Sequence, residues 1–166
     1  MRDRSALPWW VWLGVSVVVI VLDQLTKHLV QQQLTYGSAI DVTPFFDLVL
    51  VFNPGAAFSF LSTAPGWQRP FFIFVAAVAS AVILVLLRKN ESDRTFCFAL
   101  GMILGGAIGN LIDRVLLGAV VDFLHFHVGS HYWPAFNVAD SAITCGAALL
   151  IWGSIGRPHA KQEQIP

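Results

Sequence analysis

Four long apolar segments constrain this chain more than any other feature. They lie at about residues 9–30, 70–87, 95–117 and 138–156. An α-helix needs about 20 mostly apolar residues to cross the hydrocarbon core of a bilayer. The last three segments satisfy this length, and the first does so only if it includes the turn from Asp23 to Lys27. The sequence therefore predicts an all-α polytopic membrane protein with four transmembrane helices. We expect residues 1–166 to form a single membrane domain.

The composition agrees with a bilayer as the solvent. Hydrophobic residues make up 56% of the 166 residues and charged residues only 12%, whereas a soluble domain has roughly 25% charged residues. The formal net charge is zero, so the overall charge gives no reason to expect a nucleic-acid partner.

The basic residues predict the orientation. Cytoplasmic loops of membrane proteins carry an excess of Lys and Arg. Seven of the ten basic residues fall on one side of the four predicted helices: Arg2, Arg4, Arg88, Lys89, Arg94, Arg157 and Lys161. We therefore expect both termini and the 88–94 loop in the cytoplasm. The connections 31–69 and 118–137 then lie on the outer side.

The first outer connection has the composition of β-structure. Residues 40–52 are rich in β-branched and aromatic side chains, and Asn53, Pro54 and Gly55 follow them. This pattern is typical of strands and a turn, so we expect a small β-rich segment at about 36–60. The second outer connection carries Tyr132 and Trp133, which suit the level of the lipid headgroups.

Four aspartates lie inside or at the edge of the apolar segments. They are Asp23, Asp113, Asp122 and Asp140. An ionisable group at membrane depth costs roughly 2.5 kcal/mol or more and is a functional-site hypothesis by default. All four fall toward the outer ends of the predicted helices, so the sequence predicts that they share one depth.

Local structural roles compete with catalysis at three of these positions. Asp23 and Lys27 are spaced i,i+4 and can pair on one helix face. Asp113 is followed by Arg114, which would hold it as a charged ion pair. The Asn137 and Asp140 spacing also fits a capping box at a helix start. Asp122 has no obvious local partner.

Two neighbouring carboxyl groups are suited to peptide hydrolysis. Like charges a few ångströms apart do not both ionise easily, so the pair shares one proton. The ionised member can deprotonate a water, and the protonated member can donate to a carbonyl oxygen or a leaving amine. Periodicity and spacing do not select the substrate.

His125 and His127 offer a different chemistry. With Asp122 they could bind a metal ion, whereas histidines in an outer aqueous loop need no such role. The chain lacks the H-E-x-x-H helix of zinc proteases. We expect no metal site and no cofactor.

Several motifs resemble those of one membrane-protease family, lipoprotein signal peptidase (signal peptidase II). The motifs are the blocks Asp23–Lys27, Asn53–Ser59, Gly109–Arg114, Val120–Phe123 and Phe136–Ser141. They agree with the family in order and spacing from about residue 8 to residue 156. One departure is Pro54, where a threonine is usual, and proline removes a backbone donor.

The resemblance implies specific roles. Asp122 and Asp140 would be the catalytic dyad of an aspartyl endopeptidase. The other site residues would position the peptide, shape the site or form a β-cradle over it: Asp23, Lys27, Asn53, Gly55, Asn110, Asp113, Arg114 and Asn137. The family removes the signal peptide from diacylglyceryl-modified prolipoproteins and cuts before the lipidated cysteine. We expect the protein to lie in the bacterial inner membrane, in contact with membrane lipid, with its site toward the outer face. We also expect a monomer, although neither the motifs nor their spacing determine the oligomeric state.

Other function classes remain open at this point. A small proton- or cation-coupled transporter would also use intramembrane carboxylates, although such proteins often show two related halves and this chain shows no repeat. In a non-catalytic assembly factor, the aspartates would serve only as caps and ion pairs.

Overall fold

Four membrane-length helices form the body of the protein. The computed structural model describes residues 7–55 and 66–155. The helices are α1 (Val11–Gln33), α2 (Gln68–Lys89), α3 (Arg94–Leu116) and α4 (Val138–Ile155). Each is long and apolar enough to cross a membrane, which confirms the predicted four-helix membrane fold. The expected helix residue 156, the tail beyond it and residues 56–60 of the expected β-rich segment lie outside the described residues.

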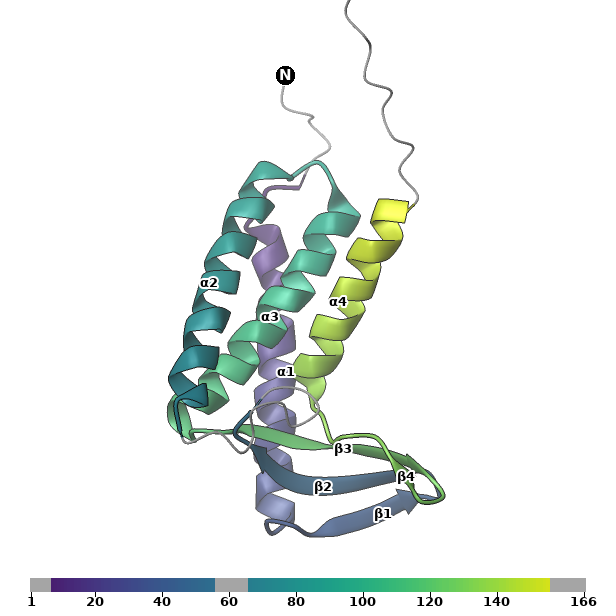
Figure 1. Ribbon diagram of the computed structural model, residues 1–166. Helices are drawn as coiled ribbons and strands as arrows, with labels where there is room; N and C mark the ends of the chain where they lie inside the picture. Colours follow the sequence, from purple (N-terminus) through teal and green to yellow (C-terminus); the bar gives the residue numbers. More distant parts are fainter. Residues whose placement is uncertain (1–6, 56–65, 156–166) are drawn as a thin grey trace, which may run out of the picture.

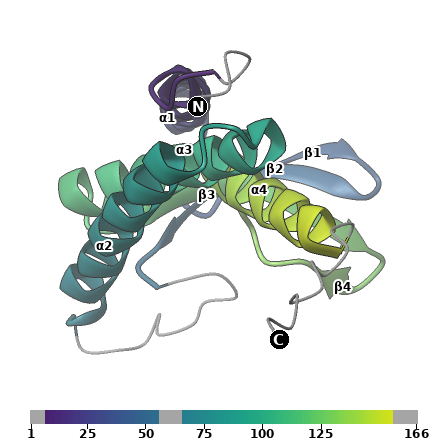
Figure 2. The ribbon, with the colours of Figure 1, turned by 90° about the horizontal axis from the view of Figure 1, so that it is seen from above.

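Helix α3 lies at the centre of the bundle and packs against the other three helices (Figure 2). Small residues allow the close packing. A Cβ atom at Gly105 would lie only 2.7 Å from the Cβ of Val19, so α1 and α3 approach too closely for a larger residue there. Helix α3 is consequently the most buried of the four spans.

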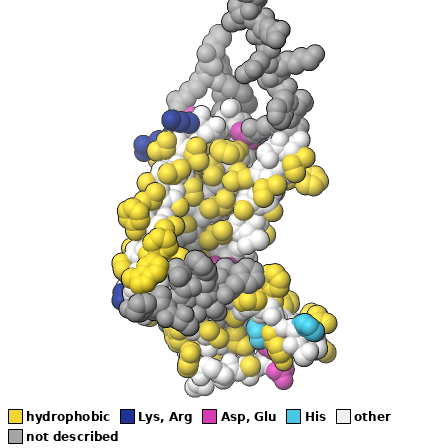
Figure 3. Space-filling view, viewed as in Figure 1, with side chains coloured by type: hydrophobic (Ala, Val, Ile, Leu, Met, Phe, Trp, Pro, Cys, Tyr) yellow, Lys and Arg dark blue, Asp and Glu magenta, His cyan; other side chains and the backbone are white. Residues whose placement is uncertain are grey.

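The outer surface of the bundle is apolar, as a bilayer requires. Figure 3 shows hydrophobic side chains over the helices and basic side chains toward the ends. Exposed Val, Leu, Phe and Ile residues occur on the helices, such as Val18, Phe74 and Ile151. Because lipid replaces water around such a surface, these exposed side chains are consistent with a membrane-spanning protein.

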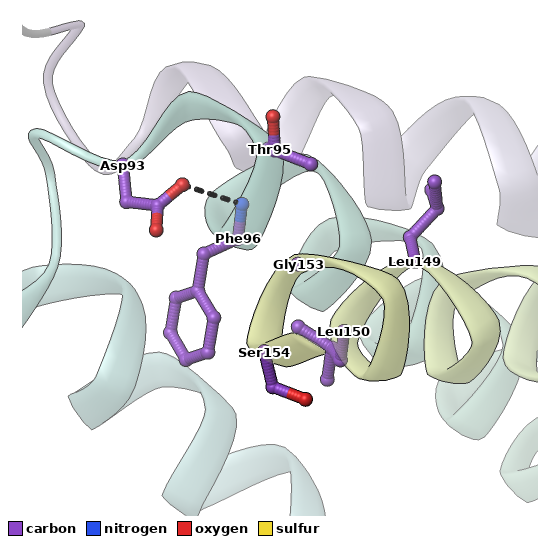
Figure 4. Close-up of a pocket in the computed structure, with 7 residues that line it drawn as sticks. All are labelled: Asp93, Thr95, Phe96, Leu149, Leu150, Gly153 and Ser154. Atoms are coloured by element: carbon purple, nitrogen blue, oxygen red, sulfur yellow. Dashed lines mark hydrogen bonds between the residues drawn. The ribbon is translucent and has the colours of Figure 1, made fainter. Parts of the chain in front are cut away.

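The bundle is closed at the end where α2 turns into α3. Trp12, Leu87 and Leu100 belong to a buried apolar cluster there. Asp93 caps α3 by accepting a hydrogen bond from the Phe96 N–H at 3.0 Å. A small cavity of about 100 Å³ lies beside this cap, between the start of α3 and the end of α4 (Figure 4). None of the expected site residues lines it.

A four-stranded antiparallel sheet covers the opposite end of the bundle (Figure 1). Its strands follow the order β1 (Ala39–Thr43), β2 (Phe46–Asn53), β3 (Val120–Val128) and β4 (His131–Tyr132). The predicted β-rich segment contains β1 and β2. Strands β3 and β4 lie in the 118–137 connection, which the sequence had not indicated as β-structure.

Helix α1 contacts the start of β3, and α2 contacts the end of α3 just before it. Leu34, at the end of α1, packs with Leu50 and Val121 in a second buried cluster. Arg69 of α2 donates to the carbonyl oxygens of Arg114 and Val115, each at 2.9 Å, which satisfies backbone acceptors at the end of α3. The chain then turns at Gly118, whose φ of 83° favours glycine, and enters the sheet.

Candidate active site

Four aspartates meet where the sheet joins the helix bundle. Asp23 lies on α1, Asp113 near the end of α3, Asp122 on β3 and Asp140 in the first turn of α4. Asp23, Asp113 and Asp122 are each at most 3% exposed. The hydrogen bonds described below join all four into one network, whereas the sequence predicted only that they share one depth.

Asn137 connects Asp122 to Asp140. Its side-chain Nδ2 donates to Asp122 Oδ1 at 2.7 Å, and its Oδ1 accepts the backbone N–H of Asp140 at 2.8 Å. The second interaction is the predicted helix cap. Asn137 therefore caps α4 and also donates to a site carboxylate. The Asp140 carboxylate does not complete a capping box with the Asn137 N–H, and its side-chain donor is a residue of α3.

That residue is Asn110. Contacts to both its amide nitrogen and its amide oxygen determine the orientation of its side-chain amide. Its Nδ2 donates to Asp140 Oδ1 at 2.7 Å. Its Oδ1 accepts from Lys27 Nζ at 3.0 Å and from Asn137 Nδ2 at 3.2 Å. The amide nitrogen must therefore face Asp140. The two aspartates are thus linked through two amides, each of which donates to one carboxylate.

Burial raises the pKa of Asp122 to about 7, and the negative charge of Asp140 adds to the rise. Hydrogen bonds from Asn53 and Asn137 and the positive charge of Lys27 act in the opposite direction. The net direction indicates a carboxyl that holds a proton near neutral pH. A group with such a pKa beside a second carboxyl can share one proton with it, which is the arrangement that acid–base hydrolysis requires.

A buried ion cluster lies behind these two carboxyls. Lys27 Nζ is 2.8 Å from Asp23 Oδ2 and 2.7 Å from Asp113 Oδ2. The predicted i,i+4 pair is therefore present. The expected pair of Asp113 with Arg114 is wrong, because adjacent residues on a helix do not face each other and Asp113 binds Lys27 instead. Gln24, for which the sequence suggested no role, donates to Asp113 Oδ1 at 2.9 Å.

Arg114 contacts the backbone of the outer connection. Its Nη2 donates to the Gly55 carbonyl oxygen at 2.9 Å, and its guanidinium lies over the Phe72 ring at 5.0 Å. Arg114 therefore holds in place the segment that carries Asn53, whose Nδ2 donates to Asp122 Oδ2 at 3.0 Å.

Pro54 is compatible with this turn. Asn53 Oδ1 accepts the Gly55 N–H at 2.9 Å, which closes a side-chain turn around residue 54. Because the N–H comes from Gly55, the missing donor of proline is not needed. Residues 56–59 of the same motif lie outside the described residues.

His125 and His127 lie near the carboxylate of Asp47 and not near that of Asp122. Their ring nitrogens lie 3.7 and 3.3 Å from the two oxygens of Asp47 on β2, and both rings stack on Tyr132. Among residues 7–55 and 66–155, no three His, Cys, Asp or Glu side chains are arranged to hold a metal ion. Asp47 was not among the predicted residues, because its position opposite His125 depends on the register between β2 and β3.

The sequence and the fold of this chain are similar to those of known proteins. A family model described as signal peptidase (SPase) II matches residues 15–156. A lipoprotein signal peptidase of Paraburkholderia phymatum is 56% identical over 146 residues, which cover 88% of each chain. One of Janthinobacterium sp. is 53% identical, over 93% of this chain and 92% of the relative. A bacterial membrane enzyme solved by the in meso method superposes with a TM-score of 0.82 at 30% identity, over 94% of each chain.

Proposed function

Because this chain belongs to the signal peptidase II family, we propose that it removes the signal peptide from diacylglyceryl-modified prolipoproteins by cutting before the lipidated cysteine. Asp122 and Asp140 are the two carboxyls of an aspartic mechanism. The peptide bond is hydrolysed by a water that one carboxylate deprotonates, while the other carboxyl donates a proton to the substrate.

The observation that supports the dyad is the amide link between its members. Asn137 donates to Asp122, Asn110 donates to Asp140, and the two amides are hydrogen-bonded to each other. Such fixed donors hold two carboxyls in one geometry without supplying a proton of their own. Asp113 does not share this arrangement, because Lys27, Gln24 and the Val121 N–H occupy its carboxylate.

The remaining polar residues support the pair and the substrate. Asn53 and Gly55 form the turn above Asp122, and Arg114 holds that turn against α3. Asp23, Lys27 and Asp113 form the buried base of the site. The substrate peptide lies between this turn and the start of α4, where the dyad faces the outer side.

A cleavage assay on a lipid-modified precursor tests the proposal. The purified enzyme in lipid should release the signal peptide, and a strong chelator should leave the rate unchanged because two carboxyls and one water suffice. Replacement of both His125 and His127 with Gln should also retain most activity. Activity lost in the chelator and restored by zinc would contradict the aspartic mechanism, and an ion flux without cleavage would favour the transporter, which the family assignment disfavours.

The proposed orientation places both termini in the cytoplasm of a bacterial inner membrane, with the enzyme a monomer. The structure places the start of α1, the α2–α3 turn and the end of α4 at one end of the bundle and the sheet at the other (Figure 1). Reporter fusions after Lys89 and in the turn at Gly129 should therefore report opposite sides, with Lys89 cytoplasmic. Two fusions on the same side, or Lys89 outside, would refute this orientation.

A further inference from the structure

The buried ion cluster contacts the backbone immediately before each dyad residue. Asp23 Oδ1 accepts the N–H of Ala139 at 2.9 Å, and Ala139 precedes Asp140. Asp113 Oδ2 accepts the N–H of Val121 at 3.0 Å, and Val121 precedes Asp122. Helix α4 and strand β3 are thus each held by a carboxylate one residue away from the group that performs the chemistry.

A single ammonium joins these two carboxylates. Lys27 Nζ binds Asp23 Oδ2 at 2.8 Å and Asp113 Oδ2 at 2.7 Å. Its third hydrogen bond goes to Asn110 Oδ1 at 3.0 Å, so all three protons of the ammonium have acceptors. Lys27 is 1% exposed and Asp23 is fully buried, so water does not compete for these contacts.

We propose that Lys27 is a positioning residue that sets the spacing between Asp122 and Asp140. One path runs from Lys27 through Asp23 and the Ala139 N–H to Asp140. The other path runs from Lys27 through Asp113 and the Val121 N–H to Asp122. This role rests on the proposed dyad and assigns to Lys27 no contact with the substrate.

The third contact of Lys27 fixes the direction in which the amides donate. Because the ammonium occupies Asn110 Oδ1, the Asn110 Nδ2 can only face Asp140. Asn137 then donates to the same Oδ1 and to Asp122. Lys27 therefore determines both the separation of the carboxyls and the side from which each receives its hydrogen bond.

The packing around Asp23 leaves little room for adjustment. A Cβ atom at Gly109 would lie 2.7 Å from Asp23 Oδ2, so α3 approaches the carboxylate directly. Gln24 Nε2 donates to Asp23, to Asp113 and to the Gly109 carbonyl oxygen. Gln24 is thus a second bridge between the two anchoring carboxylates, on the same turn of α1 as Asp23.

Lys27→Arg changes the distance between the two bound carboxylates without removing the positive charge. The guanidinium keeps the positive charge, but it is larger and its donors lie in one plane, so it holds the two carboxylates farther apart. A misplacement of about 1 Å can cost about 100-fold in rate. We expect kcat of the folded variant to fall about 10- to 100-fold with KM changed less than about twofold. Lys89→Arg, the same change at an exposed position of α2, is the matched control and should keep the original kcat.

Folding must be measured in the same preparations, by the melting temperature in lipid and the amount of inserted protein. A Lys27→Arg enzyme that is folded and retains full kcat would overturn the inference, because charge alone would then suffice. If Lys27→Arg does not accumulate, Asp23→Asn decides. It keeps an oxygen for the Ala139 N–H but turns an amide toward Lys27, and an unchanged kcat there would likewise overturn the inference.

The dyad variants distinguish this failure from failure of the proposed function. If Asp122→Asn or Asp140→Asn is active, the proposed dyad is wrong. If both are inactive while Lys27→Arg turns over normally, the dyad stands and the positioning role of Lys27 alone is refuted.

Discussion

Asp122→Asn and Asp140→Asn should each lower kcat by about 10²- to 10⁴-fold, the usual contribution of general acid–base assistance. Asparagine nearly matches aspartate in shape, so the variants should still fold, insert and bind substrate. What they lose is the group that takes up or gives the proton. Cleavage of a lipid-modified precursor, measured in the steady state over a range of substrate concentrations at matched protein levels, provides kcat and KM separately.

The two losses should not add. Because both carboxyls act on one water, the double variant should be about as inactive as either single variant. Asp113→Asn is the comparison, since its carboxylate contacts the backbone and Lys27 rather than the dyad. It should turn over faster than the dyad variants. Abolished turnover in Asp113→Asn together with an active Asp122→Asn would assign the dyad to Asp113 and Asp140 instead.

The pH dependence of kcat/KM should be bell-shaped and should report the carboxyl pair of the free enzyme rather than either residue. Since the pKa of Asp122 is raised to about 7, the shared proton is retained below that pH and lost above it. The rate should therefore fall as pH rises through about 7. It should also fall at low pH, when the second carboxyl becomes protonated. A rate that rises steadily to pH 9 would exclude a shared proton.

Lys27→Met should destabilise the protein by about 3–5 kcal/mol, because removal of one partner from a buried ion pair leaves uncompensated charge. Here two carboxylates, Asp23 and Asp113, lose the same ammonium. Methionine fills much of the lysine volume, so the loss reflects charge rather than a cavity. Equilibrium unfolding of the purified protein in mixed micelles measures the difference in free energy.

Lys89→Met provides the reference for this measurement, since Lys89 is exposed at the end of α2. Surface substitutions usually stay within about 0.5 kcal/mol. If Lys27→Met is as stable as Lys89→Met, then the buried cluster does not depend on the ammonium, and its charges must be compensated in another way.

Hydropathy alone predicts the four helices, because a bilayer requires about 20 apolar residues per span and few other patterns satisfy this. The same argument places the four aspartates at one depth. It does not predict β3, because Val120, Val121, Asp122 and Phe123 are all buried, and a strand covered on both faces lacks the alternation that identifies strands.

The partners of the aspartates depend on tertiary contacts. Sequence proximity suggested Arg114 for Asp113, but the actual partners, Lys27 and Gln24, lie more than 80 positions away. The i,i+4 pair of Asp23 and Lys27 was predictable because a single helix determines it. The amide links through Asn110 and Asn137 required three separate elements to meet.

At positions 121 and 139 the backbone, and not the side chain, makes the contact to the ion cluster. Val121 and Ala139 contribute only their N–H groups to Asp113 and Asp23, and every amino acid except proline supplies that donor. Both residues are fully buried, so side-chain volume is the other limit. The residues that determine the spacing of the two carboxyls therefore lie at 23, 27 and 113. A search for determinants of activity that scores only residues hydrogen-bonded to Asp122 and Asp140 would overlook all three.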